Sequence, residues 1–159
     1  MSRYLDHEEL IRRGLNRHEA RRYADALGYF NRALAQTPGC PLAEYNKANS
    51  LHMLGLDAEA EPLLRRLMAA TDADLRTACP VARPRSLRLD AAYLLFLALV
   101  HGQGFSAEAF GFADLHLRLR GRGVLSVWSA REVRAEVAAF RCEWQSSTLN
   151  KALPQTAGA

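Results

Sequence analysis

The stretch YADALGYFNRAL, residues Tyr23–Leu34, decides the fold of this chain. Its apolar residues recur with the spacing of an amphipathic helix. Its small residues Ala26 and Ala33 lie where an isolated surface helix would gain nothing from them. We therefore expect other helices to pack closely on this one, with Ala26 facing the helix before it and Ala33 facing the next structural unit.

The flanking sequence predicts helices on both sides of this stretch. Upstream, Asp6 followed three residues later by Glu9 is a capping-box pattern that opens a helix reaching about Ala20. Downstream, Thr37-Pro38-Gly39 ends the quoted helix, because proline and glycine do not continue a helix cheaply. The same hairpin then recurs, with helices predicted over 42–54 and 58–70 and a turn over 55–57.

The two predicted hairpins are related by a fixed period. Ala26 and Ala60 lie 34 positions apart, as do Phe30 and Leu64. A 34-residue period of two helices and a turn is typical of a solenoid. Ala26, Phe30 and Pro38 follow the spacing of the second helix of a tetratricopeptide repeat (TPR), and the chain resembles that family. Further matching positions are Gly14, Tyr23 and Ala33 in the first unit and Ala48, Gly55, Ala60, Leu64 and Asp72 in the second.

The resemblance implies an all-α, TPR-like α-α superhelix of about three helical hairpins plus a C-terminal capping helix. Arg13 and Arg17 stand where the family prefers apolar groups, which suggests a terminal repeat with a partly solvated face. Gly104 and Ala109 align with Gly55 and Ala60 only if 15 residues are inserted. The expected organisation is a single domain over 1–146, with repeats at 7–40, 41–74 and 90–118, a loop insertion at 75–88, a capping helix at 129–145 and a flexible tail at 147–159.

Composition bounds the class of protein. The chain of 159 residues is 49% hydrophobic and 24% charged, with a net charge of +4, which is typical of a folded domain. Three cysteines are an odd number without metal-like spacing, and the N-terminus MSRYLDHEEL is charged from the start. The longest apolar run, Ala91–Val100, has ten residues, about half of what a membrane span needs. These features predict a cytoplasmic protein with no membrane insertion.

The TPR resemblance implies a concave groove lined by the first helix of each hairpin. Its apolar groups suit a peptide or protein segment with apolar anchors, and Tyr45 is expected to contribute most to affinity. Asn46 matches the asparagine of the family's carboxylate clamp, but the other clamp positions do not match, which argues against binding of chaperone tails. The candidate groove residues are Ile11, Leu15, His18, Tyr45, Asn46, Asn49, His52, Met53, Leu94, Ala98 and His101.

Three of these candidates, His18, His52 and His101, fall at one repeat position. Equivalent positions on stacked helices are expected to lie roughly 8–10 Å apart, too far for three histidines to close on one zinc ion. We therefore predict no metal and no cofactor. Ligand affinity that changes between about pH 6 and pH 7 is a softer hypothesis for the same histidines.

The sequence shows no constellation for catalysis, such as a glycine-rich phosphate loop or a nucleophile elbow, so an enzyme is not expected. The predicted function is a protein–protein interaction module, a scaffold, adaptor or chaperone-like protein. One alternative is a self-associating subunit, a possible homodimer, that uses the apolar run Ala91–Val100. A weaker alternative is binding of RNA or DNA through an arginine patch formed by Arg83, Arg85, Arg88, Arg118, Arg120 and Arg122.

Overall fold

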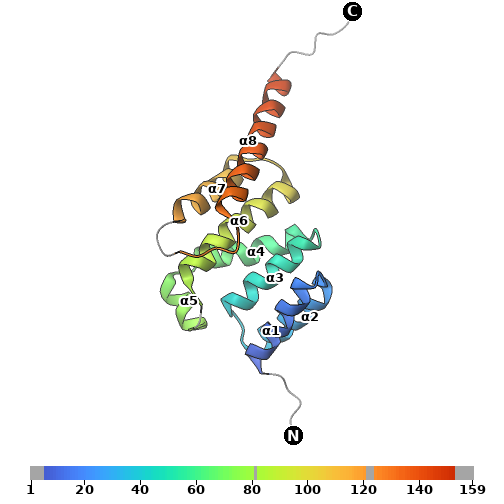
Figure 1. Cartoon of the computed structure of the whole chain (residues 1–159), viewed down its shortest axis with the longest axis vertical. Coiled ribbons are helices and arrows are strands. Elements are labelled where there is room, and N and C mark those ends of the chain that lie inside the picture. Colours follow the sequence, from blue (N-terminus) through green and yellow to red (C-terminus); the bar gives the residue numbers. More distant parts are fainter. Residues whose placement is uncertain (1–5, 81, 121–123, 153–159) are drawn as a thin grey trace, which may run out of the picture. The chain divides into compact units, whose positions relative to one another are not determined.

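The computed structural model describes residues 6–80, 82–120 and 124–152, and these contain eight helices and no strand. Packing divides the chain into two units, Met1–Ser126 and Val127–Ala159. The helices of the first unit succeed one another in chain order from blue to orange in Figure 1. They are α1 (His7–Glu19), α2 (Tyr23–Gln36), α3 (Pro41–Met53), α4 (Asp57–Ala69), α5 (Asp72–Ala78), α6 (Pro84–Gln103) and α7 (Ala107–Leu119).

Three antiparallel pairs form the first unit: α1 with α2, α3 with α4, and α6 with α7. Each pair packs on the next, because α2 contacts α3 and α4 contacts α6. The helices that open the pairs also touch, α1 against α3 and α3 against α6. The all-α class and the packing of neighbouring helices are therefore confirmed.

Close packing depends on the small residues that the sequence singled out. Ala26 and Ala33 are both 0% exposed. Ala33 belongs to a buried cluster that includes Ala43 of α3, as expected for a residue facing the next hairpin. At Gly14 of α1, a Cβ atom would lie only 2.5 Å from the ring of Phe30 on α2. The α1–α2 crossing therefore depends on a residue without a side chain.

The predicted loop over 75–88 was wrong over most of its length. Residues 75–78 belong to α5, which Thr71 and Asp74 open with a complete capping box, and Leu75 of this helix is buried. Pro84 starts α6, because the first turn of a helix tolerates a residue without an N–H. The first helix of the third pair accordingly begins six residues before position 90, where the sequence placed it.

The second unit contains α8 (Ala130–Ala152), which is longer than the predicted helix over 129–145. The expected tail from 147 is helical up to 152, and residues 153–159 lie outside the described residues. Within this extension Ser146 Oγ donates to the carbonyl of Cys142 at 2.9 Å, and Thr148 Oγ1 donates to that of Gln145 at 2.9 Å. Polar side chains bonded in this way remain compatible with a helix. The single domain over 1–146 stays a prediction.

Candidate functional site

The face formed by α1, α3 and α6 holds most of the residues predicted to bind a partner. His18 near the end of α1 reaches α3, where its Nδ1 lies 2.9 Å from Ser50 Oγ. Asn49 Nδ2 lies 3.3 Å from the other ring nitrogen of His18. Further along, the rings of His52 on α3 and His101 on α6 are stacked. Side-chain contacts therefore connect the first helices of all three pairs.

Exposure divides the predicted groove residues into three groups: buried, exposed and half-buried. Tyr45, Leu94 and Ala98 are buried, at 7%, 0% and 3% exposure, so they belong to the core and cannot present much surface to a ligand. Tyr45 in particular is too buried for the anchoring role expected of it. Met53 is 46% exposed, and His101 is exposed as well. The half-buried remainder are Ile11, Leu15, His18, Asn46, Asn49 and His52.

The two asparagines of α3 differ in their hydrogen bonds. Asn46 Nδ2 donates to the carbonyl of Leu42 at 2.8 Å, so part of its amide is used within its own helix. Asn49 Oδ1 is buried and has no hydrogen-bond partner among the described residues. A buried acceptor left without a donor costs about 1–3 kcal/mol, so a ligand that supplies a donor there would gain affinity.

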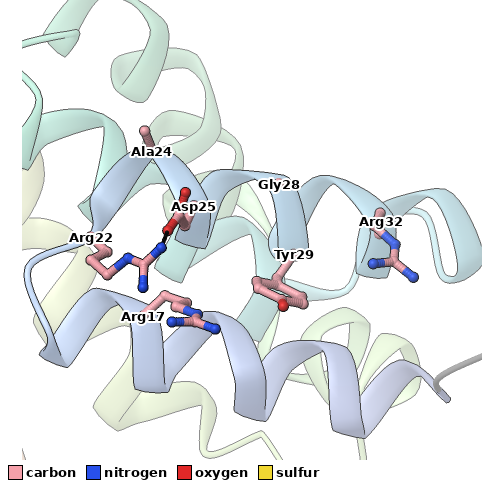
Figure 2. Close-up of a pocket in the computed structure, with 7 residues that line it drawn as sticks. All are labelled: Arg17, Arg22, Ala24, Asp25, Gly28, Tyr29 and Arg32. Carbon is pink, nitrogen blue, oxygen red and sulfur yellow. Dashed lines mark ion pairs between the residues drawn. The ribbon is translucent and has the colours of Figure 1, made fainter.

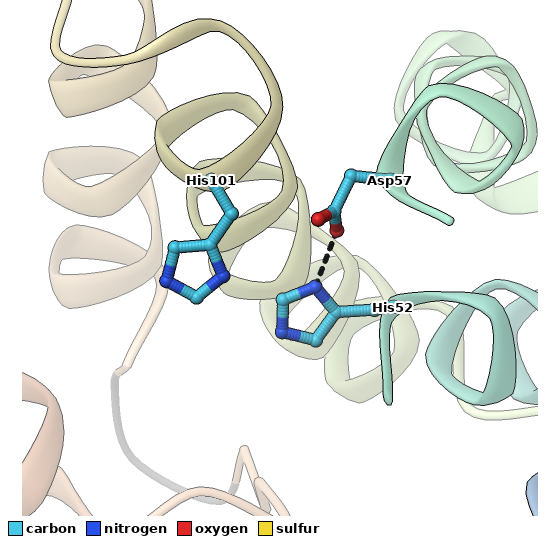
Figure 3. A group of neighbouring side chains, drawn as sticks. All are labelled: His52, Asp57 and His101. Atoms are coloured by element: carbon cyan, nitrogen blue, oxygen red, sulfur yellow. Dashed lines mark hydrogen bonds and ion pairs between the residues drawn. The ribbon is translucent and has the colours of Figure 1, made fainter. Parts of the chain in front are cut away.

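A compact cluster of metal-ligating side chains lies at one end of this face. His52 in the last turn of α3, Asp57 at the start of α4 and His101 in the last turn of α6 point toward one another in Figure 3. His52 Nδ1 is 2.5 Å from Asp57 Oδ1, and both side chains are only 9% exposed. The two histidine rings are nearly parallel, 5.3 Å between centroids with an interplanar angle of 11°.

This arrangement corrects the expected separation of the histidines. The ring centroids of His52 and His101 lie closer together than the predicted helix spacing, because the two side chains extend toward each other from α3 and α6. His18 is engaged with Ser50 and Asn49 of α3 instead. Its place in the cluster is taken by Asp57, which lies in the turn that the sequence predicts over 55–57 and is the first residue of α4 in the structure. The turn at Gly55, with φ of +73°, folds α4 back so that Asp57 meets His52.

A separate cleft lies between α1 and α2, as Figure 2 shows. It has a volume of about 450 Å³ and is lined by Arg17, Arg22, Ala24, Asp25, Gly28, Tyr29 and Arg32. Arg22 pairs with Asp25 at 2.5 Å. Within the described residues, no ion pair involves Arg17 or Arg32. Of the two arginines expected on a solvated face, Arg17 lines this basic cleft, whereas Arg13 pairs with Glu9 at 2.7 Å.

The arginines of the proposed nucleic-acid patch are divided among different surroundings. Arg88 pairs with Asp72 at 3.4 Å and also donates to the carbonyl of Ala70. Arg83 and Arg85 line one cavity together with Arg76. Arg118 lines another cavity, beside Asp114. Arg122 lies outside the described residues. Binding of RNA or DNA through these arginines stays a prediction.

One cysteine–histidine pair was not foreseen from the sequence. His7 Nε2 lies 3.2 Å from Cys40 Sγ, in a buried cluster that also contains Cys79. Cys40 is 1% exposed, and burial raises the pKa of its thiol. An activated cysteine needs the opposite, an accessible thiol with a lowered pKa. This pair therefore fits a structural role.

No protein-family model, curated protein or solved structure matches the chain. The TPR resemblance stays a prediction based on the repeat pattern. Among the described residues, no helix combines the length and apolar character needed to cross a bilayer.

Proposed function

We propose that this chain is a protein-interaction module with a TPR-like solenoid, which holds a segment of a partner protein on the face formed by α1, α3 and α6. The 34-residue period in the sequence and the succession of three antiparallel helix pairs support this architecture. In this proposal the chain is a cytoplasmic scaffold or chaperone-like protein. Such a role requires binding of a partner and no catalysed reaction.

One observation carries the proposal: α1 contacts α3 and α3 contacts α6, so one face runs across the three pairs. This face offers half-buried apolar groups at Ile11 and Leu15 and an exposed one at Met53. Asn49 adds a polar side chain whose Oδ1 has no hydrogen-bond partner among the described residues. Apolar anchors with a few polar contacts are what recognition of a peptide segment requires.

The test is photocrosslinking in native cells. A photoreactive phenylalanine analogue replaces Met53 on the proposed face, and in a matched control it replaces Glu59, which is exposed on α4. We expect a defined partner to be crosslinked from position 53 and not from position 59. Equal crosslinking of the same protein from both positions would contradict binding at this face. Met53→Asp should then weaken capture of that partner, because a charge replaces an apolar contact.

The self-association alternative was based on an apolar run that a second copy of the chain would cover. The apolar run Ala91–Val100 is covered within the chain itself, since its ten residues are each 8% exposed or less. No bare apolar helix face is therefore left along this run for a second copy to cover.

A further inference from the structure

We propose that His52, Asp57 and His101 form a zinc-binding site that links the second helix pair to the third. One ligand atom from each residue can be chosen so that all three lie within 4.8 Å of one another. The three side chains come from three helices, α3, α4 and α6, whose ends meet at this point. The inference concerns a site of this chain alone and does not depend on the proposed partner-binding function.

The ligand types suit zinc. Imidazole nitrogens and carboxylate oxygens bind Zn²⁺ at about 2.0–2.2 Å. In a tetrahedral site, bonds of that length place neighbouring ligand atoms roughly 3.3–3.6 Å apart. The present separations, from 2.5 Å between His52 Nδ1 and Asp57 Oδ1 up to at most 4.8 Å, bracket that value. At each limit the separation differs from that value by about an ångström, a difference of the size that side-chain adjustment supplies.

The charge and the solvent access of the cluster favour binding of a cation there. Asp57 supplies one negative charge, and its side chain is 9% exposed, so the attraction is only weakly screened by solvent. Glu61, one helical turn after Asp57, accepts a hydrogen bond from Gln103 of α6 at 2.7 Å and ties α4 to α6 beside the cluster, while its charge is balanced by Arg65 at 2.7 Å. His101 is exposed, so an ion can reach the site from solvent.

Three protein ligands leave a fourth tetrahedral position for water or for a ligand from another molecule. Because Zn²⁺ would bind the folded arrangement and not the separated helices, it would stabilise the junction between the second and third pairs. Two consequences are measurable: saturable 1:1 binding and a higher melting temperature in the presence of zinc.

The experiment uses the tag-free full chain, freed of metal with a chelator, in a Cys142→Ser background because the Cys142 thiol is exposed and would compete for zinc. Binding of Zn²⁺ is measured by calorimetry, and Co²⁺ serves as a spectroscopic probe of tetrahedral coordination. The variants are His101→Gln, which changes an exposed side chain, and Asp57→Asn, which keeps the shape of the side chain. His18→Gln is the matched control, since His18 has the equivalent repeat position outside the cluster.

We expect one zinc ion per chain, a visible absorption typical of tetrahedral Co²⁺, and a zinc-dependent rise in melting temperature. His101→Gln and Asp57→Asn should each weaken binding at least tenfold and abolish the rise, whereas His18→Gln should retain both. The proposal is overturned if the parent chain shows no saturable binding, or if His101→Gln binds zinc as the parent does.

Discussion

At the scale of the residue, substitution of alanine for glycine should change the free energy of unfolding in opposite directions at two positions on facing helices. A Cβ at Gly14 would lie 2.5–2.8 Å from three ring atoms of Phe30, which is fully buried and cannot give way. A Cβ at Gly28, in the middle of α2, would meet nothing within 4 Å. We expect Gly14→Ala to lower the free energy of unfolding by about 1–3 kcal/mol through overpacking.

Gly28→Ala is the control, and we expect it to raise the free energy of unfolding by roughly 0.5–1 kcal/mol, because alanine loses less conformational freedom in a helix. Urea denaturation followed by circular dichroism measures both variants. Two changes of the same sign would mean that the α1–α2 crossing is looser than the Gly14–Phe30 distances indicate.

At the scale of the element, α5 depends on its cap. The helix has seven residues, too few to be stable by propensity alone. Thr71 Oγ1 accepts from the backbone N–H of Asp74 at 3.1 Å, and the Asp74 carboxylate accepts from the backbone N–H of Thr71 at 3.0 Å. Thr71→Ala removes the side-chain acceptor and should cost about 0.5–2 kcal/mol.

We expect that loss to be confined to α5, so amide hydrogen exchange should accelerate there and stay unchanged in α4. Thr71→Ser, which keeps the hydroxyl, should retain most of the protection. Uniform acceleration across the first unit would contradict a local role for the cap.

The same element shows where prediction from sequence succeeded and where it failed. Apolar spacing and capping patterns were sufficient for the helices around Ala26 and Ala60, because those signals are local. The prolines of the stretch TACPVARP, residues 77–84, were interpreted as chain breakers. This interpretation failed at Pro84, because proline disrupts a helix interior but is accepted in the first turn. The Thr71–Asp74 capping box was visible in the sequence and would have identified α5.

At the scale of the whole molecule, the candidate site could be predicted only in part. Repeat alignment placed His52 and His101 at equivalent positions, but their 5.3 Å approach depends on how α3 packs against α6. Asp57 enters the cluster through the turn at Gly55, and Tyr45 and Leu94 are buried through packing. Such properties arise from contacts between distant segments, which periodicity within one helix does not encode.

The stability of the whole molecule should also depend on pH through a buried histidine. His116 of α7 is 0% exposed, and its Nδ1 lies 2.6 Å from the carbonyl of Leu89 on α6. Burial lowers the pKa of His116 below its ordinary value of 6.5; the bond to Leu89 opposes this shift and nearby Arg120 reinforces it. Burial lowers the pKa of His18 in the same way, against a smaller opposing effect of Glu19.

The direction of the pH effect on the free energy of unfolding depends on whether the folded or the unfolded chain protonates these histidines first. Well above pH 6.5 both histidines are neutral in the folded and the unfolded chain, so their contribution to stability is complete. As the pH falls below about 6.5, the unfolded chain binds protons before the folded chain does, and the free energy of unfolding decreases, by at most about 1.4 kcal/mol per pH unit for each proton. The decrease ends once the pH has passed below the lowered pKa values of the folded chain.

We therefore expect urea midpoints to fall as the pH is lowered from 7.5 to 5, with the slope reduced in His116→Asn, whose amide can still donate toward Leu89. The comparison uses the slope and not the stability at one pH, because His116→Asn also leaves a cavity beside Tyr93, whose ring centroid lies 5.2 Å from that of His116. His18→Gln should reduce the slope further when the two changes are combined. A slope that is the same in parent and double variant would show that these buried histidines do not couple protonation to folding.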